Sequence, residues 1–219
     1  VRRPRPVRPR PERARRAVEN AGLSERIDVR LGDGLTVLEP GEVHTVVMAG
    51  MGGGLMRRLL SADPEKTRSF QRLVLQPNMA SYQLRSAMFD LRWKLMDEQL
   101  VWDDGHLYEV LAYESGNDDT YAAAAETLGR ADPFTFLRHD WFLLFLLGPH
   151  LLLRAWYGED EEQRRFLLQQ VDRAIDKRQR ILAGLKQARG AAEQEKMHRL
   201  TTQLAQLEVL AQCMRTGRP

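Results

Sequence analysis

The sequence has a single cysteine, no long apolar run and none of the common phosphate-loop or zinc motifs. Cys213 stands alone, so no disulfide can form within the chain, as is usual in a reducing cytosol. The longest apolar run, residues 141–147, is far shorter than the ~18 residues that a membrane span needs. No Gly-x-x-x-x-Gly-Lys-Ser/Thr loop occurs, and no Cys or His cluster has zinc spacing. We therefore expect a cytoplasmic protein without a membrane segment or a metal site.

Net positive charge is confined to the first residues of the chain. The net charge is +3, but residues 1–16 carry eight Arg and one Glu, which leaves −4 on residues 17–219. Residues 1–11 alternate between Arg and Pro, so they can form neither helix nor strand ladder, and we expect a disordered tail. Two interpretations stay open for this tail. It is either a phosphate-binding arm or the misread, out-of-frame start of a GC-rich gene.

The residues that follow the tail alternate between helical and β-type patterns. Helical patterns at 12–20, 54–60 and 79–91 are interleaved with β-type runs at 27–31, 43–48 and 72–76, the order of a doubly wound parallel sheet. Two further β-type runs, 93–102 and 107–113, flank Asp104-Gly105, a strong hairpin signal. The sequence therefore predicts an α/β, Rossmann-like domain over residues 12–115 that ends in an antiparallel strand pair.

The C-terminal part of the chain predicts helices. Residues 116–158 are expected to be a linker with connecting helices, and residues 159–215 an antiparallel coiled-coil hairpin broken near Gly190. Dimerisation through the same apolar stripes is the alternative, although two adjacent stripes of about three heptads each favour pairing within one chain. The stripes are Leu168, Val171, Ile175, Arg178, Leu182 and Leu185, followed by Met197, Leu200, Leu204, Leu207, Ala211 and Met214.

Three glycine-rich or amide-rich segments follow the predicted parallel strands. They are Gly32-Asp33-Gly34, the run from Ala49 to Gly54 with four glycines, and Gln76-Pro77-Asn78. Open α/β folds bind ligands where such strand ends meet, so we expect these segments to face one concavity. Glycines let a ligand approach the backbone, and a carboxylate or carboxamide can bind ribose or a base edge. The alternatives are a tight turn at Asp33 and a helix cap at Asn78.

Other candidate residues have simpler explanations. His139 and His150 are expected to cap helices or pack, and the acidic residues 159–162 to form the first turn of a helix. Four aromatic residues could stack on a base, but their spacing favours core packing: Tyr82, Trp93, Trp102 and Tyr108.

Several of these runs together resemble a known family. They are ENAGL (19–23), VRLGDGL (29–35), AGMGG (49–53), LQPN (75–78), DDGHLYEV (103–110) and FLLGPHLLLR (145–154). In order and spacing they resemble the bacterial TrmK family, tRNA (adenine-N1)-methyltransferases that use S-adenosyl-L-methionine and modify adenine 22 of the D-arm. The resemblance covers roughly residues 14–214.

The resemblance implies roles for particular residues. It implies that the cofactor S-adenosyl-L-methionine is bound by Asp33, Gly34, Ala49, Gly50, Met51 and Gly52, and that the target base lies beside Gly53, Gln76 and Asn78. It identifies no general base. It further implies that the helical hairpin holds tRNA, that the protein acts as a monomer, and that no membrane is involved.

The first part of the family's domain has no counterpart in this sequence. The family begins with a strand and a loop that hold the methionine part of the cofactor, followed by a second strand whose acidic end holds the ribose. We therefore expect a truncated or frameshifted start that deprives strand 27–31 of its neighbours. We also expect the chain as written to bind the cofactor poorly or not at all and to show no methyl transfer. The alternative functions are a non-catalytic RNA-binding or adaptor remnant and another Rossmann enzyme with a nucleotide cofactor.

Overall fold

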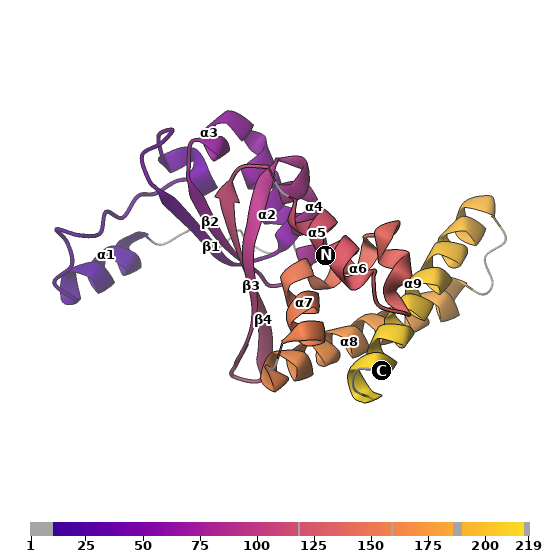
Figure 1. Cartoon of the computed structure of the whole chain (residues 1–219). Helices are drawn as coiled ribbons and strands as arrows, with labels where there is room; N and C mark the ends of the chain where they lie inside the picture. The colour runs from indigo at the N-terminus through magenta and orange to yellow at the C-terminus, as the bar shows by residue number, and fades with distance from the viewer. Residues whose placement is uncertain (1–10, 118, 159, 186–189, 217–219) are drawn as a thin grey trace.

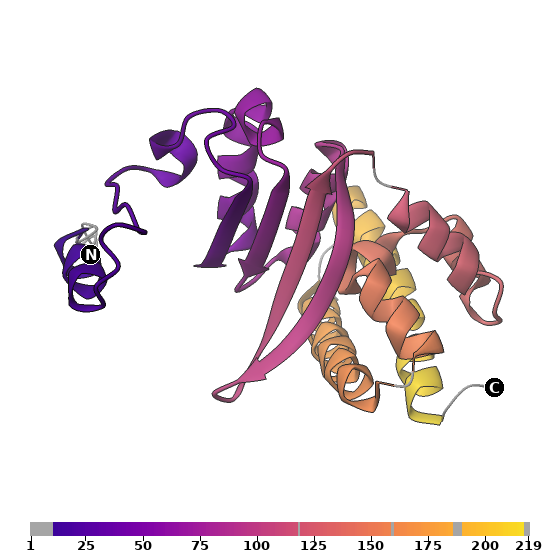
Figure 2. The ribbon, with the colours of Figure 1, turned by 60° about the vertical axis from the view of Figure 1, so that its left-hand side comes forward.

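The structure, a computed structural model, describes residues 11–117, 119–158, 160–185 and 190–216. It consists of one mixed sheet with helices packed beside it, and α1 with the following irregular segment extends away from this body (Figures 1 and 2). The predicted disordered tail lies outside the described residues, apart from Pro11, which begins α1.

The elements of the N-terminal half are α1 (Pro11–Asn20), η1 (Gly34–Val37), β1 (Thr45–Met51), α2 (Gly53–Ala62), α3 (Pro64–Arg68), β2 (Arg72–Pro77), α4 (Ser81–Asp90), β3 (Trp93–Asp103) and β4 (His106–Ser115). The C-terminal half consists of α5 (Thr120–Leu128), η2 (Phe134–Arg138), α6 (Phe142–Leu147), α7 (Pro149–Tyr157), α8 (Glu161–Leu185) and α9 (Ala191–Thr216).

The four-stranded sheet has the order β1-β2-β4-β3. β1 and β2 pair in parallel across the α2–α3 crossover, whereas β4 is antiparallel to both β2 and β3. The turn between β3 and β4 has positive φ at Asp104 (43°) and Gly105 (77°), the conformation that an Asp-Gly hairpin favours. The predicted α/β fold and its antiparallel strand pair are confirmed.

The prediction of a strand at residues 27–31 is wrong for this structure. The segment is irregular, and Ile27 and Leu31 are 44% and 61% exposed. In the described part of the chain β1 is an edge strand that pairs only with β2. A β-type sequence becomes a strand only when its N–H and C=O groups find a neighbouring ladder, and none of the described strands offers one to these residues.

The core lies on one face of the sheet. Met48, Leu75 and Leu111, which face each other across β1, β2 and β4, are buried against the helices. On the other face Val47 is 67% exposed, and its neighbours Val74 and Ala112 are half-buried. The alternation along the strands therefore separates a helix-covered face from an open one.

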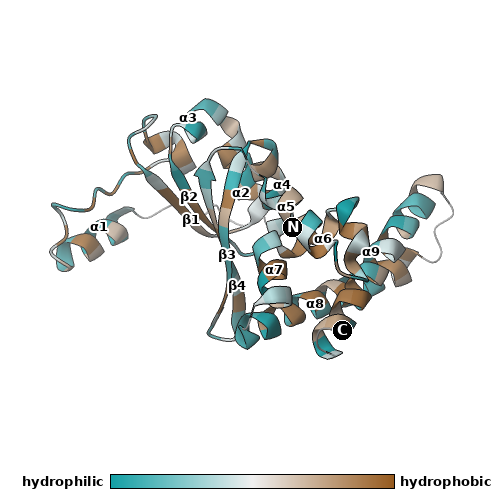
Figure 3. Cartoon of the chain, in the orientation of Figure 1, coloured by the Kyte–Doolittle hydropathy of each residue, from teal (hydrophilic) through white to brown (hydrophobic). Residues whose placement is uncertain are grey.

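The two C-terminal helices form the antiparallel hairpin that the apolar stripes predicted. The start of α8 meets the end of α9, where Arg164 Nη2 donates to the carbonyl oxygen of Met214 at 2.9 Å. Polar and apolar residues alternate along both helices in Figure 3. Whether the hairpin supercoils stays a prediction.

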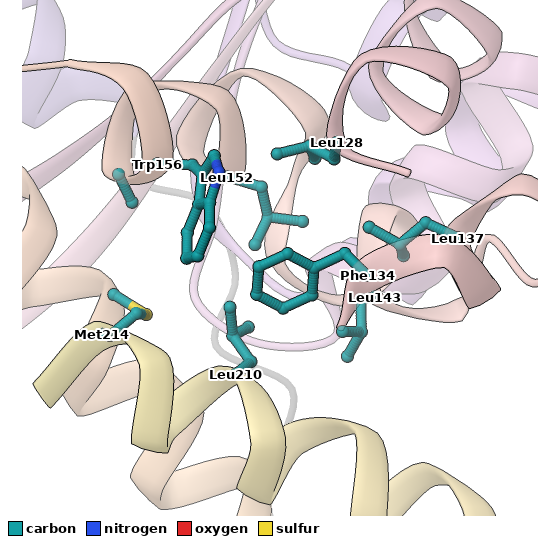
Figure 4. Close-up of a pocket in the computed structure, with 9 residues that line it drawn as sticks. Leu128, Phe134, Leu137, Leu143, Leu152, Trp156, Leu210 and Met214 are labelled. Carbon is teal, nitrogen blue, oxygen red and sulfur yellow. The ribbon is translucent and has the colours of Figure 1, made fainter. Parts of the chain in front are cut away.

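The hairpin does not stand alone but packs on the connecting helices. In Figure 4, Leu210 and Met214 of α9 face Phe134, Leu152 and Trp156 across an apolar seam. The cavity in this seam measures about 10 Å³, close to the smallest space that holds one water molecule. The seam is therefore a packing interface, and it fixes the hairpin to the rest of the fold.

Candidate functional site

The loop between β1 and α2 is built from glycines that keep its backbone accessible. Gly50 has φ +77°, and the pairing of β1 with β2 shifts register between Ala49 and Met51. A Cβ atom at position 50 would have no heavy atom within 4 Å. The chain at this point therefore faces open space, where a ligand can approach the peptide groups closely.

The loop after β2 is hydrogen-bonded to the loop after β1. Gly50 N–H donates to Gln76 Oε1 at 2.9 Å, Gln76 Nε2 donates to Asn78 Oδ1 at 3.1 Å, and Asn78 N–H donates to the carbonyl oxygen of Met51 at 2.9 Å. A backbone N–H can only donate, so each amide in this series has one orientation. Asn78, which is exposed, consequently presents its NH2 group as the donor left for a ligand.

A close backbone contact holds the two loops together at the start of α2. Gly53 N–H donates to the carbonyl oxygen of Met79 at 2.8 Å, and Ala80 adopts φ 58° at the beginning of α4. A Cβ atom at position 53 would lie 2.6 Å from the carbonyl oxygen of Ala80. Only glycine fits here. The sequence patterns gave no signal for Met79 and Ala80, because their part in the site is made by the backbone.

Asp33 and Gly34 lie at the start of η1. Thr36 Oγ1 donates to the carbonyl oxygen of Asp33 at 2.9 Å. A Cβ atom at Gly34, whose φ is +57°, would lie 2.9 Å from the Leu59 side chain of α2. Among the described residues no hydrogen bond joins Asp33 to either glycine-rich or amide-rich loop. The structure thus brings residues 49–53 together with Gln76 and Asn78, while the role of Asp33 stays a prediction.

A buried ion pair supports α4, the helix that follows the second loop. Arg85 Nε donates to Glu98 Oε1 at 2.6 Å and Arg85 Nη2 to Glu109 Oε2 at 2.8 Å. The side chains of Arg85 and Glu98 are both fully buried. Burial opposes the charged form of Arg85, but the two carboxylates outweigh it and raise its pKa. Burial raises the pKa of the Glu98 carboxyl against the attraction of Arg85.

The same ion pair fixes the junction between α6 and α7. Arg85 Nη1 also lies 3.3 Å from the carbonyl oxygens of Phe145 and Leu146. Glu98 Oε2 accepts from His150 N–H at 3.0 Å, and a Cβ atom at Gly148 would collide with the Glu98 carboxylate. The turn Gly148-Pro149-His150 thus makes room for the Glu98 carboxylate and donates a hydrogen bond to it. The His150 ring is half-buried and lies 3.1 Å from the carbonyl oxygen of Leu95, in a packing role as the sequence analysis expected.

Glu109 connects the helical hairpin to the start of α4. Its Oε1 accepts from Ser81 Oγ at 3.0 Å and from Gln170 Nε2 of α8 at 2.9 Å. Ser81 follows Ala80, which touches Gly53. A chain of contacts therefore runs from α8 to the glycine loop through one carboxylate.

The Lys and Arg side chains of the hairpin, which the resemblance implies holds tRNA, differ in exposure. Arg178 is only 9% exposed, lies over the ring of Phe142 at 4.7 Å, and is not available to a phosphate. Arg164 is half-buried and Lys186 and Arg189 lie outside the described residues. The exposed members are Arg165, Lys177, Arg180, Lys196 and Arg199.

Two negative findings concern only the part of the chain that the structure describes. Its His, Cys, Asp and Glu side chains form no group of three suited to a metal ion. None of its helices has both the length and the hydropathy for crossing a membrane.

Comparisons with known proteins identify relatives of this chain. A methyltransferase-domain family matches residues 7–111. A tRNA (adenine(22)-N(1))-methyltransferase of Bacillus subtilis (strain 168) is 33% identical over 174 residues, which are 76% of this chain and 66% of that protein. The chain thus spans just under two thirds of the curated relative.

Two crystal structures show the same fold. The B. subtilis M1A22 tRNA methyltransferase TrmK matches with a TM-score of 0.72 and 30% identity, over 90% of this chain and 76% of that one. A putative tRNA (m1A22) methyltransferase of Streptococcus pneumoniae, in complex with S-adenosyl-L-methionine, matches with a TM-score of 0.63 and 25% identity, over 90% and 74% of the two chains. The resemblance inferred from the sequence is confirmed: the chain belongs to the TrmK family of bacterial tRNA (adenine-N1)-methyltransferases.

Proposed function

We propose that the chain transfers a methyl group from S-adenosyl-L-methionine to N1 of an adenine in the tRNA D-arm, adenine 22. The observation that carries the proposal is the hydrogen-bonded pair of loops, residues 49–53 and 76–80, which sets an open glycine backbone beside an outward-facing amide. The names of the relatives support the substrate and the cofactor. A tRNA substrate also favours the cytoplasm as the place of action.

The residues present fit such a cofactor and base. The bound cofactor would supply an activated methyl group, so the task of the protein is chiefly alignment. Residues 49–52 would let the cofactor approach the backbone, with Asp33 and Gly34 beside its adenine. The NH2 group of Asn78 would hold a ring acceptor of the target base other than N1, which leaves the N1 lone pair facing the methyl group. N1 would form its bond to the methyl carbon as the carbon–sulfur bond of the bound cofactor broke, and the positive charge would pass from sulfur to the ring.

The exposed cations of the hairpin support tRNA contact by α8 and α9. We propose that Lys177 and Arg180, among others, face phosphates. The alternative is an ordinary solvated surface, since Asp172, Asp176 and Glu195 are interleaved with them. A Lys177→Gln/Arg180→Gln variant whose tRNA affinity and salt dependence equal those of the parent would exclude these residues from binding.

Methyl transfer to a defined tRNA tests the proposed function. The purified chain is incubated with saturating S-adenosyl-L-methionine and tRNA carrying either adenine or guanine at position 22, and the digested tRNA is analysed for 1-methyladenosine. The proposed function requires the modified nucleoside in the adenine-22 tRNA and not in the guanine-22 tRNA, whereas no product in either tRNA would agree with the expectation that the chain as written is inactive. The cofactor is used at saturating concentration so that weak cofactor binding is not mistaken for an inability to transfer the methyl group.

A second measurement separates the enzyme from an adaptor. Calorimetric titration with S-adenosyl-L-methionine measures cofactor binding directly and tests the expectation that the chain as written binds it weakly. Tight tRNA binding with neither cofactor binding nor methyl transfer would contradict the proposed enzyme and favour the non-catalytic RNA-binding alternative.

A further inference from the structure

A groove between α2 and α4 begins where the glycine loop ends. It measures about 880 Å³, and its lining includes Gly54, Arg57, Arg58, Tyr82, Gln83 and Ser86. Gly54 follows Gly53, the residue that joins the two loops, so the groove continues the candidate site along the helices. The two helices lie against each other in the fold (Figure 1).

The groove carries two arginines without protein partners. Arg57 and Arg58 are exposed, and within the described residues neither side chain takes part in a hydrogen bond or an ion pair. Exposed Arg68 and Arg92 likewise have no such partner within the described residues, whereas Arg72 pairs with Glu114 and the half-buried Arg154 with Asp97. Asp90 lines the same groove and is the one acidic side chain among its lining residues.

An exposed aromatic ring lies on the opposite wall. Tyr82, in the first turn of α4, is 44% exposed, and its hydroxyl oxygen accepts from Gln83 Nε2 at 2.9 Å. This position differs from the core packing expected from the sequence. A ring held in the open at low entropic cost is a suitable surface for stacking an unpaired base.

The combination selects a ligand chemistry. Unpaired guanidinium groups bind phosphate oxygens in bidentate geometry, hydroxyls such as that of Ser86 bind phosphate or sugar oxygens, and Tyr82 offers a stacking face. We propose that the groove between α2 and α4 binds the sugar–phosphate backbone of the tRNA next to the target adenine, with a neighbouring unpaired base stacked on Tyr82. This inference rests on the proposed function. An acidic peptide would use the arginines but not the aromatic ring.

The test compares two double variants with equal charge changes. Arg57→Gln/Arg58→Gln removes the cations of the groove, whereas Arg130→Gln/Arg138→Gln removes two exposed cations that do not line it. Binding of tRNA is measured against salt concentration. We expect the groove variant to bind at least about tenfold more weakly at low salt, with the slope of log K against log salt reduced by about 1.4–1.8, the value for two lost phosphate contacts. The control variant should match the parent protein.

Tyr82→Ala separates stacking from charge. We expect tRNA affinity to fall by about fivefold or more without a change of salt slope, while calorimetry shows unchanged binding of S-adenosyl-L-methionine. If the parent protein methylates tRNA and the groove variants bind tRNA as tightly as the control variant, the proposed role of the groove is wrong but the proposed function stands. Binding of polyglutamate, a model of an acidic protein partner, is measured in parallel. Groove variants that lose polyglutamate binding but keep tRNA binding would also overturn the proposed role of the groove. A parent protein that binds no tRNA would overturn the proposed function together with the groove.

Discussion

Replacing Gly53 with alanine is expected to lower kcat/KM for tRNA methylation by about 100-fold or more. The new methyl group would lie 2.6 Å from the carbonyl oxygen of Ala80 and 3.1 Å from that of Met79. Both are backbone atoms, so they can move only if the two loops separate. A displacement of about 1 Å at a reacting centre is enough for a loss of this size. Steady-state kinetics with tRNA, together with calorimetry for the cofactor, measures the effect.

Gly54→Ala is the matched control for this substitution. A Cβ atom at position 54 would meet only Gln83 Oε1, at 3.3 Å, the end of a flexible side chain that can move aside. Alanine is also the better helix former inside α2. We expect the Gly54→Ala protein to keep its kcat at saturating tRNA and its unfolding free energy. Because Gly54 lines the groove between α2 and α4, its tRNA affinity is measured separately. A Gly53→Ala protein that is folded and equally active would show that the contact between the loops is not needed for the reaction.

Replacing Arg85 with leucine is expected to destabilise the protein by about 3–5 kcal/mol. The substitution leaves the fully buried Glu98 carboxylate without its cationic partner. It also removes the donor to Glu109 and to the carbonyl oxygens at the end of α6. Urea unfolding of the variant and the parent measures the loss. A change of less than about 1 kcal/mol would mean that the pair contributes little to the fold.

The same variant should become less stable as pH rises. Burial already raises the pKa of Glu98 in the folded state, so this group favours the folded state most below its unfolded pKa and loses that contribution as pH rises through the folded pKa. Without Arg85 the opposing attraction disappears, and the loss grows. We expect the unfolding free energy of Arg85→Leu to fall as pH rises above the ordinary pKa of a glutamate carboxyl. Arg85→Leu/Glu98→Gln has no carboxyl at position 98 and should show little of this dependence.

The sequence predicted those features that local patterns determine. The parallel strands β1 and β2, the Asp-Gly hairpin and the helical hairpin follow from alternation, turn chemistry and heptad spacing. The glycines after β1 and the amides after β2 could also be identified, because strand ends of an open sheet meet at one edge. In the structure the two loops are joined by hydrogen bonds between Gly50 and Gln76 and between Asn78 and Met51.

Features that depend on long-range contacts could not be predicted. Residues 27–31 have a β-type sequence but no described neighbour to pair with. Arg85 and Glu98 look like ordinary surface charges in a helix and a strand, yet the fold buries both. The contact between Gly53 and Ala80 is made by backbone atoms, and no side-chain pattern records it.

The orientation of the Arg85–Glu98 ion pair also matches the dipoles of the two helices that it touches. Arg85 lies at the carbonyl end of α6, where the helix macrodipole is negative, and Glu98 accepts from an amide at the start of α7, where it is positive. Each charge thus complements the helix end that it touches as well as its partner. An exchanged pair would keep its mutual attraction but would set like charge against both helix ends. Gly148 lies between these two helix ends, so a single ion pair complements the negative end of one helix dipole and the positive end of the next on either side of it.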